Sequence, residues 1–281
     1  FNTCCTVNPR VYRENRVPLT LPRAQTARSV VVVGGGPAGL KAALTAAQRG
    51  HQVTLVEQSG ALGGLMIPAS VGAFKEDLRR YLSYLRRQVE KSQIHVMLHT
   101  RADRALLEHL HPDAVILAVG GRAVMPPVPG LGTSGAVQAV ALLNAGLETA
   151  GTRVTILGGG SIGCELALEL AALDRMVTVV ELRDKLAANG NELYRQDLML
   201  HLEQETRITI LTHTVCTGVT AQGCTVREKD GGTRVIPHDT FVIAAGLRAD
   251  ADAVEALYGV VPETYYVGDC KRAASITEAT T

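Results

Sequence analysis

Two glycine-rich turns, each followed by an acidic residue, are the stretches of this sequence whose residue types and spacing could do chemistry. The first runs from Gly34 to Gly39, directly after four consecutive valines. In such a turn the first glycine permits the sharp bend, the second lets a pyrophosphate approach the backbone, and the third lets the next helix pack closely. Glu57 ends the following apolar run, where a carboxylate can accept hydrogen bonds from ribose hydroxyls. The pattern predicts a strand, a helix and a second strand that together bind a dinucleotide.

The same pattern occurs again further along the chain. Its three glycines are Gly158, Gly160 and Gly163, and Glu181 closes the next apolar run. The two patterns lie about 124 residues apart, counted from Gly34 to Gly158, and two complete copies are not expected by chance. We therefore expect two dinucleotide sites, each at a helix N-terminus whose free N–H groups attract phosphate.

Composition limits the classes of partner. The 281 residues are 46% apolar, which is enough for two domains with their own cores. The net charge is +1, aromatic residues make up 4% and tryptophan is absent, so we expect neither a nucleic acid nor a membrane as partner. The scattered cysteines suggest no disulfide framework and no secretory leader is visible, which favours a cytoplasmic protein.

Cys4 and Cys5 are the unusual part of the N-terminal segment. Adjacent cysteines cannot form an ordinary short disulfide, and two thiols at one chain end do not complete a metal site. They are either free thiols, or one of them is a ligand of a cluster whose other ligands lie upstream of this sequence.

With these residues in view, the chain resembles flavoproteins that have two dinucleotide-binding domains. Within them it is most similar to the C-terminal half of the 2,4-dienoyl-CoA reductase, 2-enoate reductase and trimethylamine dehydrogenase family. The resemblance covers nearly the whole chain and rests on CTVNPR ahead of the first turn, GGGPAGLKAA, the Leu62-Gly63-Gly64 loop, the AVG and AAG strand ends, and VGDC.

The resemblance implies an α/β fold of two Rossmann-like domains, in which an NAD(P)H-binding domain is inserted into an FAD-binding domain, as in glutathione reductase. The implied segments are 1–27 as a leash with a cluster-type cysteine, 28–150 as the first part of the FAD domain, 151–238 as the NAD(P)H domain and 239–281 as the return of the FAD domain. No CxxC or CxxxxC pair occurs, so a dithiol disulfide reductase is disfavoured.

The resemblance also assigns cofactor sites residue by residue. For FAD it implies Gly34, Gly36, Pro37, Ala38 and Gly39 at the pyrophosphate, Glu57 at the adenosine ribose, Gly63 and Gly64 in a loop beside the nucleotide, Ala102 near the adenine, Gly120 lining the site and Asp269 on the ribityl chain. For the nicotinamide dinucleotide it implies Gly158, Gly160, Ser161, Ile162, Gly163 and Glu181. Cys5 matches the last ligand of the family's 4Fe-4S cluster. No catalytic acid or base is assigned, because the cofactors carry the chemistry.

The choice between NADH and NADPH is predicted from charge. Glu181 ends its strand where the ribose 2′ position would lie. A carboxylate about 4 Å from a 2′-phosphate costs about 1 kcal/mol per charge pair in water and about 4 kcal/mol at a protein surface. We therefore expect NADH to be favoured over NADPH, with Arg183 offsetting part of the effect.

In the family, electrons pass from the nicotinamide coenzyme to FAD, then to the 4Fe-4S cluster and to FMN in an N-terminal barrel, where the C=C bond of an enoate or enoyl-CoA is reduced. The resemblance therefore implies a barrel partner, as a missing part of a larger protein or as a separate subunit, and leaves a homo-oligomer open. One alternative is half of an amine dehydrogenase-like flavoprotein with the same architecture. Another is a nucleotide-binding electron-transfer scaffold without flavin turnover of its own.

Overall fold

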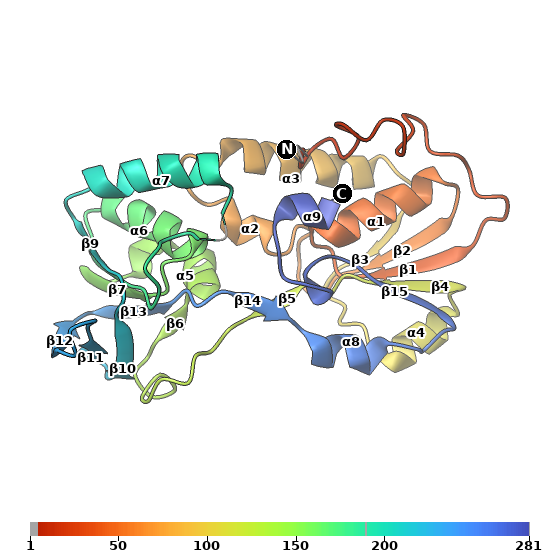
Figure 1. Cartoon of the computed structure of the whole chain (residues 1–281). Helices are drawn as coiled ribbons and strands as arrows, with labels where there is room; N and C mark the ends of the chain where they lie inside the picture. The colour runs from red at the N-terminus through yellow and green to blue at the C-terminus, as the bar shows by residue number, and fades with distance from the viewer. Residues whose placement is uncertain (1–4, 189, 281) are drawn as a thin grey trace. The chain divides into compact units, whose positions relative to one another are not determined.

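The computed structural model describes residues 5–188 and 190–280 (Figure 1). Contacts divide the chain into two compact units. The first comprises Phe1–Ser70, Lys75–Arg122 and Arg248–Thr281, and the second comprises Val71–Phe74 and Ala123–Leu247. The chain leaves the first unit along β5 (Gly121–Ala123) and returns along β14 (Leu247–Ala249), and these two strands pair with each other. The second unit is thus an insertion in the first.

A five-stranded parallel sheet forms the centre of the first unit, in the order β15-β4-β1-β2-β3. Its strands are β1 (Ser29–Val33), β2 (Gln52–Val56), β3 (His95–Met97), β4 (Ala114–Leu117) and β15 (Glu263–Tyr266). The four valines of β1 are all buried. Val30 and Val32 belong to one apolar cluster, while Val31 and Val33 belong to another. This alternation confirms a central strand that is covered on both faces.

Helices cover both faces of this sheet, as Figure 1 shows. On one side are α1 (Pro37–Gln48) and α3 (Glu76–Glu90), whose buried Leu40 and Leu85 pack with Val30 and Val32. On the other are α4 (Arg104–Leu110) and α8 (Ala251–Leu257), whose buried Leu107 and Leu257 pack with Val31 and Val33. The short elements α2 (Met66–Ala69), η2 (Gly268–Cys270) and α9 (Ile276–Thr280) complete the unit.

The second unit repeats this plan with a different outer layer. Its parallel sheet has the order β6-β13-β7-β8-β9. The strands are β6 (Val137–Gln138), β7 (Arg153–Leu157), β8 (Met176–Val180), β9 (Ile208–Leu211) and β13 (Thr240–Ile243). The helical elements are α5 (Ala139–Ala145), η1 (Leu147–Thr149), α6 (Ser161–Ala172) and α7 (Glu192–Gln204).

An antiparallel sheet of three strands forms the outer layer of the second unit: β10 (Val215–Val219), β11 (Gly223–Arg227) and β12 (Thr233–Pro237). Its buried Cys224 and Val226 share an apolar cluster with Phe241 and Ile243 of β13. The opposite face of the parallel sheet packs against α6, whose Leu166 and Leu170 are in a separate cluster with Val154 and Ile156. Helices and the antiparallel sheet therefore cover opposite faces of this parallel sheet.

The expected α/β fold with two Rossmann-like halves is confirmed, but the expected boundaries at 150/151 and 238/239 differ from the division by contacts. That division assigns residues 123–150 and 239–247 to the second unit. The reason is strand pairing: β13 lies between β6 and β7, and so belongs to the second sheet although its sequence resembles the end of β4. None of the helices in the described part of the chain is both long and apolar enough to cross a membrane.

Candidate functional site

The first glycine turn leaves β1 with a geometry that only glycine accommodates at two positions. Gly34 has φ +106°, and a Cβ there would lie 2.3 Å from the Ala118 carbonyl oxygen. At Gly39 a Cβ would lie 1.8 Å from the carbonyl oxygen of Gly34. These two glycines hold α1 tightly against the end of the sheet.

Gly36 is the exception in this turn, because a Cβ there would meet nothing within 4 Å. Gly36 is the N-cap of α1 and offers no side-chain hydrogen bond to the helix, which begins with Pro37. Ala38 and Gly39 follow in the first helical turn, where backbone N–H groups have no partner inside the helix. The space beside Gly36 and these donors fit a pyrophosphate.

Glu57 is fixed in this turn by its own carboxylate. Its side chain is 7% exposed. Gly35 N–H donates to Oε2 at 2.7 Å, and Ser59 N–H donates to Oε1 at 2.7 Å. A carboxylate has about four lone-pair positions, so each oxygen retains acceptor capacity for a ribose hydroxyl. Glu57 therefore shapes the turn in addition to the ribose role predicted for it.

The predicted loop residues Gly63 and Gly64 lie against the same turn. Gly63 N–H donates to the Gly35 carbonyl oxygen at 2.7 Å. A Cβ at Gly64, where φ is +51°, would lie 2.9 Å from Cα of Gly36. The structure thus brings the loop and the turn together, and a side chain at Gly64 would displace the backbone at Gly36.

Three further predicted FAD residues lie on neighbouring segments of the first unit. Ala102 is half-buried beside the core of α4 and β4, and Gly120, with φ +79°, follows the Ala118 that touches Gly34. Asp269 follows Gly268, whose φ is +70° and where a Cβ would lie 2.6 Å from the Cβ of Ala38. Ala274 N–H donates to the Asp269 carboxylate at 3.1 Å, and burial raises the pKa of that carboxyl.

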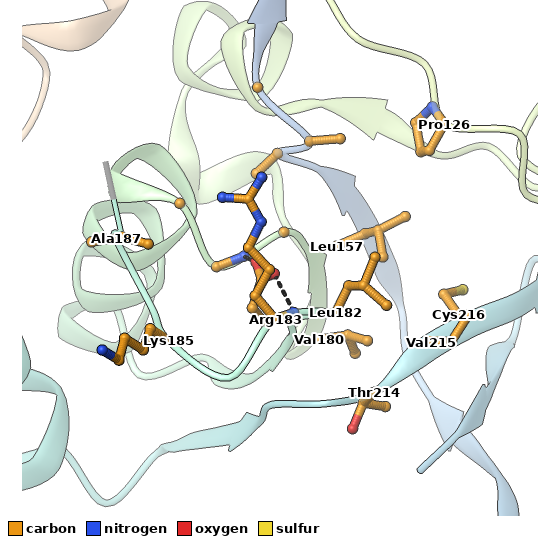
Figure 2. A pocket seen from close by; sticks show the side chains of 18 of the residues that line it. Pro126, Leu157, Val180, Leu182, Arg183, Lys185, Ala187, Thr214, Val215 and Cys216 are labelled. Atoms are coloured by element: carbon orange, nitrogen blue, oxygen red, sulfur yellow. Dashed lines mark hydrogen bonds between the residues drawn. The ribbon is translucent and has the colours of Figure 1, made fainter. Parts of the chain in front are cut away.

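A cavity of about 430 Å³ opens at the second glycine turn, entirely within the second unit (Figure 2). Of the predicted residues, Gly158, Gly160, Ser161 and Glu181 line it. Ile162 and Gly163 are not among its lining residues: Ile162 packs against the core, and a Cβ at Gly163 would lie 2.0 Å from the Gly158 carbonyl oxygen. A Cβ at Gly160 would meet nothing within 4 Å, so this turn also leaves room for a phosphate.

The carboxylate of Glu181 accepts two backbone hydrogen bonds in the same arrangement as that of Glu57. Gly159 N–H donates to Oε2 at 2.6 Å and Arg183 N–H donates to Oε1 at 2.8 Å. Arg183 and Lys185 also line the cavity, so a carboxylate and two cations lie on its wall. The negative charge of Glu181 is present as predicted. One cation, Arg183, was considered from the sequence, whereas the cavity wall carries two.

Sequence reasoning missed Lys185 and the far wall of the cavity, which Thr214, Val215 and Cys216 form. Figure 2 shows Cys216 and Thr214 on the opposite side of the cavity from Lys185 and Ala187. A signal for this wall was available. The dipeptide His-Thr follows an edge strand of each parallel sheet, β3 or β9, and both Thr100 and Thr214 donate their N–H to the carbonyl oxygen of the site glutamate at 2.9 Å.

The structure places the predicted cluster ligand Cys5 in the first unit. Asn8 N–H donates to its Sγ at 3.4 Å, and the neighbouring Thr6 accepts a hydrogen bond of 2.9 Å from Thr280 of α9. Cys4 lies outside the described residues. Over residues 5–188 and 190–280, no group of three or more histidine, cysteine, aspartate or glutamate side chains could hold a metal ion. A 4Fe-4S cluster needs four ligands, so these residues alone do not fit one.

Comparison with known proteins places this geometry in a family. The family model for pyridine nucleotide-disulphide oxidoreductases matches residues 28–262. A bilirubin reductase of Mediterraneibacter gnavus is 34% identical over 92% of this chain and 40% of its own length. A cinnamate reductase of Clostridium sporogenes is 29% identical over 98% of this chain and 41% of its own length. The chain thus spans about two fifths of the length of these curated relatives.

A solved structure gives the same picture. The 2-naphthoyl-CoA reductase superposes with a TM-score of 0.93 and 27% identity over 99% of this chain and 42% of that chain. The match extends through both units, including the N-terminal segment that precedes β1. This chain belongs to the pyridine nucleotide-disulphide oxidoreductases and, among them, to the FAD- and NAD(P)H-dependent half of the 2-enoate reductase-like flavoproteins.

Proposed function

We propose that this chain is the NADH-oxidising FAD module of an iron–sulfur flavoprotein reductase that acts on the C=C bond of an enoate or enoyl-CoA. The observation that carries the proposal is a feature that both turns share. The first and third glycines have no room for a side chain, whereas the middle glycine has free space beside it. Side chains at Gly34, Gly39, Gly158 and Gly163 would collide with backbone atoms, whereas Gly36 and Gly160 face open space. Each turn is therefore shaped for the diphosphate of a dinucleotide.

In this proposal the first unit holds FAD and the second holds NADH. When bound, FAD would accept the hydride equivalent of NADH and release the electrons singly. The chain's own residues position the two cofactors: the first turns of α1 and α6 offer N–H donors to the pyrophosphates, and Glu57 and Glu181 fix the turns and accept from the riboses. Asp269 would hold the ribityl chain, and Ala102 and Gly120 would line the flavin nucleotide.

NADH is the coenzyme that the charges at the second site favour. Both oxygens of Glu181 already accept backbone N–H groups, which holds the carboxylate at the cavity wall. A 2′-phosphate would meet this negative charge at close range. Arg183 and Lys185 reduce the penalty, so the preference is expected to be moderate and not absolute.

The onward path belongs to the same proposal and rests on the family alone. Cys5 would supply one ligand of a 4Fe-4S cluster, and the remaining ligands and an FMN barrel would come from polypeptide outside this sequence. We assign no catalytic acid or base to this chain. The bilirubin and cinnamate reductases and the 2-naphthoyl-CoA reductase are reductases by name, which supports the reductase direction over amine oxidation.

The test is an anaerobic absorption spectrum of the purified chain with FAD added, recorded before and after NADH and then NADPH. We expect a flavin band that NADH bleaches faster than NADPH. A flavin that binds but is reduced by neither coenzyme would favour the amine dehydrogenase-like alternative, and no retained flavin would favour the scaffold.

Matched variants show whether the two turns hold the two cofactors. Gly36 and Gly160 have extended backbones with φ −71° and −68° and open space at Cβ, so alanine fits the fold at both. We expect Gly36→Ala to weaken FAD binding and Gly160→Ala to weaken NADH binding, each at least tenfold. Gly132→Ala is the control, since its Cβ also meets nothing within 4 Å. Equal effects of both variants on both cofactors would contradict the assignment.

A further inference from the structure

The β10–β11 hairpin brings together two cysteines that lie eight positions apart in the sequence. Cys216 pairs with Val226 and Cys224 pairs with Val219 across the two antiparallel strands. Cys224 is two residues from Val226, so both cysteines lie on the same face as diagonal neighbours, and a hydrogen bond joins their side chains. Both belong to the apolar cluster under the parallel sheet of the second unit.

The two thiols differ in exposure and in acidity. Cys224 is fully buried, while Cys216 is 7% exposed and lines the dinucleotide cavity. A hydrogen bond from Cys224 lowers the pKa of the Cys216 thiol. The contact with Cys216 and burial together raise the pKa of Cys224. Of the pair, the thiol at the cavity is therefore the one that ionises first, and the thiolate is the reactive form.

The position in the first unit that corresponds to Cys216 carries no thiol. Thr214 and Thr100 each bond the backbone of the site glutamate, and counting two residues on from each gives Cys216 and Ala102. The first unit thus has a methyl group where the second has a thiol. Cys216 lies on β10 of the antiparallel sheet, so the thiol belongs to the second unit.

We propose that Cys216 and Cys224 form a reversible redox pair in the wall of the second dinucleotide site, which a hydroperoxide oxidises when the site is empty and which bound dinucleotide shields. The shielding rests on the proposed function, whereas the pair itself does not. In the first step the Cys216 thiolate attacks the O–O bond of hydrogen peroxide, which gives a sulfenic acid and, after protonation, water. The Cys224 thiol then attacks that sulfur, a disulfide forms and a second water leaves. Two thiols lose two electrons and two protons, and one peroxide becomes two waters.

The experiment maps the thiols by mass spectrometry. The full chain is treated with hydrogen peroxide with or without NAD⁺, alkylated under denaturing conditions and digested with trypsin. Both cysteines lie in one peptide, 208–227, because Arg207 and Arg227 flank it. We expect this peptide to lose two hydrogens and take up no alkyl group, dithiothreitol to reverse the change, and NAD⁺ to slow it at least fivefold.

Internal controls are available in the same digest. Cys164 and Cys270 are also buried, and burial raises the pKa of both thiols, that of Cys164 to about 12. Their peptides should remain reduced. Oxidation of all these thiols at one rate, or no disulfide in peptide 208–227 at a peroxide dose that oxidises Cys5, would overturn the proposal.

Two variants separate the steps. Cys216→Ala introduces the alanine that the first unit has at position 102. Cys224 should then remain unoxidised. Cys224→Ala should stop the reaction at a sulfenic acid on Cys216, which dimedone traps. If the disulfide forms but NAD⁺ does not bind in a parallel titration, the redox pair is confirmed and the proposed function is wrong at this site. If NAD⁺ binds and gives no protection, the shielding is wrong.

Discussion

The two glycine turns are built alike, and the difference between the two sites lies in what surrounds them. A Cβ at Gly34 or Gly158 would lie 2.3 or 2.5 Å from the carbonyl oxygen of the alanine that directly follows the neighbouring strand. The two site glutamates accept N–H groups at the same two relative positions. Such agreement between two distant stretches of one chain shows that the glycine spacing and the acid determine the turn.

The surroundings are not repeated. In the first site Gly63 and Gly64 lie on the turn, and Glu57 is buried. In the second, Ala187 N–H makes the corresponding bond to the Gly159 carbonyl oxygen at 2.8 Å, but Glu181 is partly exposed beside Arg183. The two sites therefore differ in the exposure of the glutamate that fixes the turn.

The largest expected effect tests whether the turns are equivalent. Gly39→Ala and Gly163→Ala would place a Cβ 1.8 and 2.0 Å from a backbone oxygen. We expect each to lower the free energy of unfolding by about 3 kcal/mol, because the helix must move away from the sheet. Urea unfolding measures this, with Gly132→Ala as the control that should change nothing. A loss at one site only would show that the likeness of the turns is superficial.

The next effect tests the difference in burial. Glutamine keeps one acceptor oxygen, so Glu57→Gln and Glu181→Gln each lose one of two charge-assisted bonds to backbone N–H groups. We expect Glu57→Gln to cost about 2 kcal/mol of stability and Glu181→Gln about half of that, since water can replace the lost bond at the more exposed site. Equal losses, measured by the same unfolding titration, would refute the distinction.

The next prediction concerns the preference of the second site for NADH over NADPH. Removing the charge in Glu181→Gln should improve NADPH binding relative to NADH about fivefold, which corresponds to the roughly 1 kcal/mol of a solvated charge pair. Arg183→Ala should shift the ratio of dissociation constants in the opposite direction by a similar factor. Lys229→Ala, at an exposed turn away from the cavity, should leave the ratio of dissociation constants unchanged. Fluorescence titration with both coenzymes gives the ratio.

The smallest effect concerns pH at the first site. Burial raises the pKa of Asp269, so the folded chain binds this proton more tightly than the unfolded chain, and stability is lost as pH rises through the folded pKa. Without FAD, Asp269→Asn should therefore melt slightly higher than the unmodified chain at pH 7, with a difference that shrinks toward lower pH.

Asp239→Asn provides a control of opposite sign. The hydrogen bond from Arg153 lowers the pKa of Asp239, so its contribution is present at neutral pH and is lost as pH falls through the folded pKa. This variant should melt lower than the unmodified chain at pH 7. A melting point that is lower for both variants would contradict the assignment for Asp269.

The turns could be predicted from the sequence because their physics is local. Gly34 to Gly39 and the four valines before them contain the bend, the helix start and a strand buried on both faces. The Cys216–Cys224 pair could not, because strand pairing across the hairpin brings the two cysteines together, and the repeated His-Thr dipeptide was the sequence signal for the far wall of the second cavity. The predicted segment ends differ from the division by contacts for the same reason: the chemical character of β13 matches either sheet, and its pairing with β6 and β7 places it in the second. The bonds that occupy both glutamates depend on backbone N–H groups, which residue types do not reveal.

The two ends of the second unit meet. Val124 N–H donates to the Gly246 carbonyl oxygen at 2.9 Å, so the polypeptide enters and leaves the main segment of this unit, Ala123–Leu247, at adjacent points. Domains with adjacent termini tolerate transfer between host proteins. Apart from Val71–Phe74, the second unit has the layout of an exchangeable cassette. We expect that its main segment can be removed near these two residues, and that another nucleotide-binding unit can be inserted there without altering the order of strands in the first sheet.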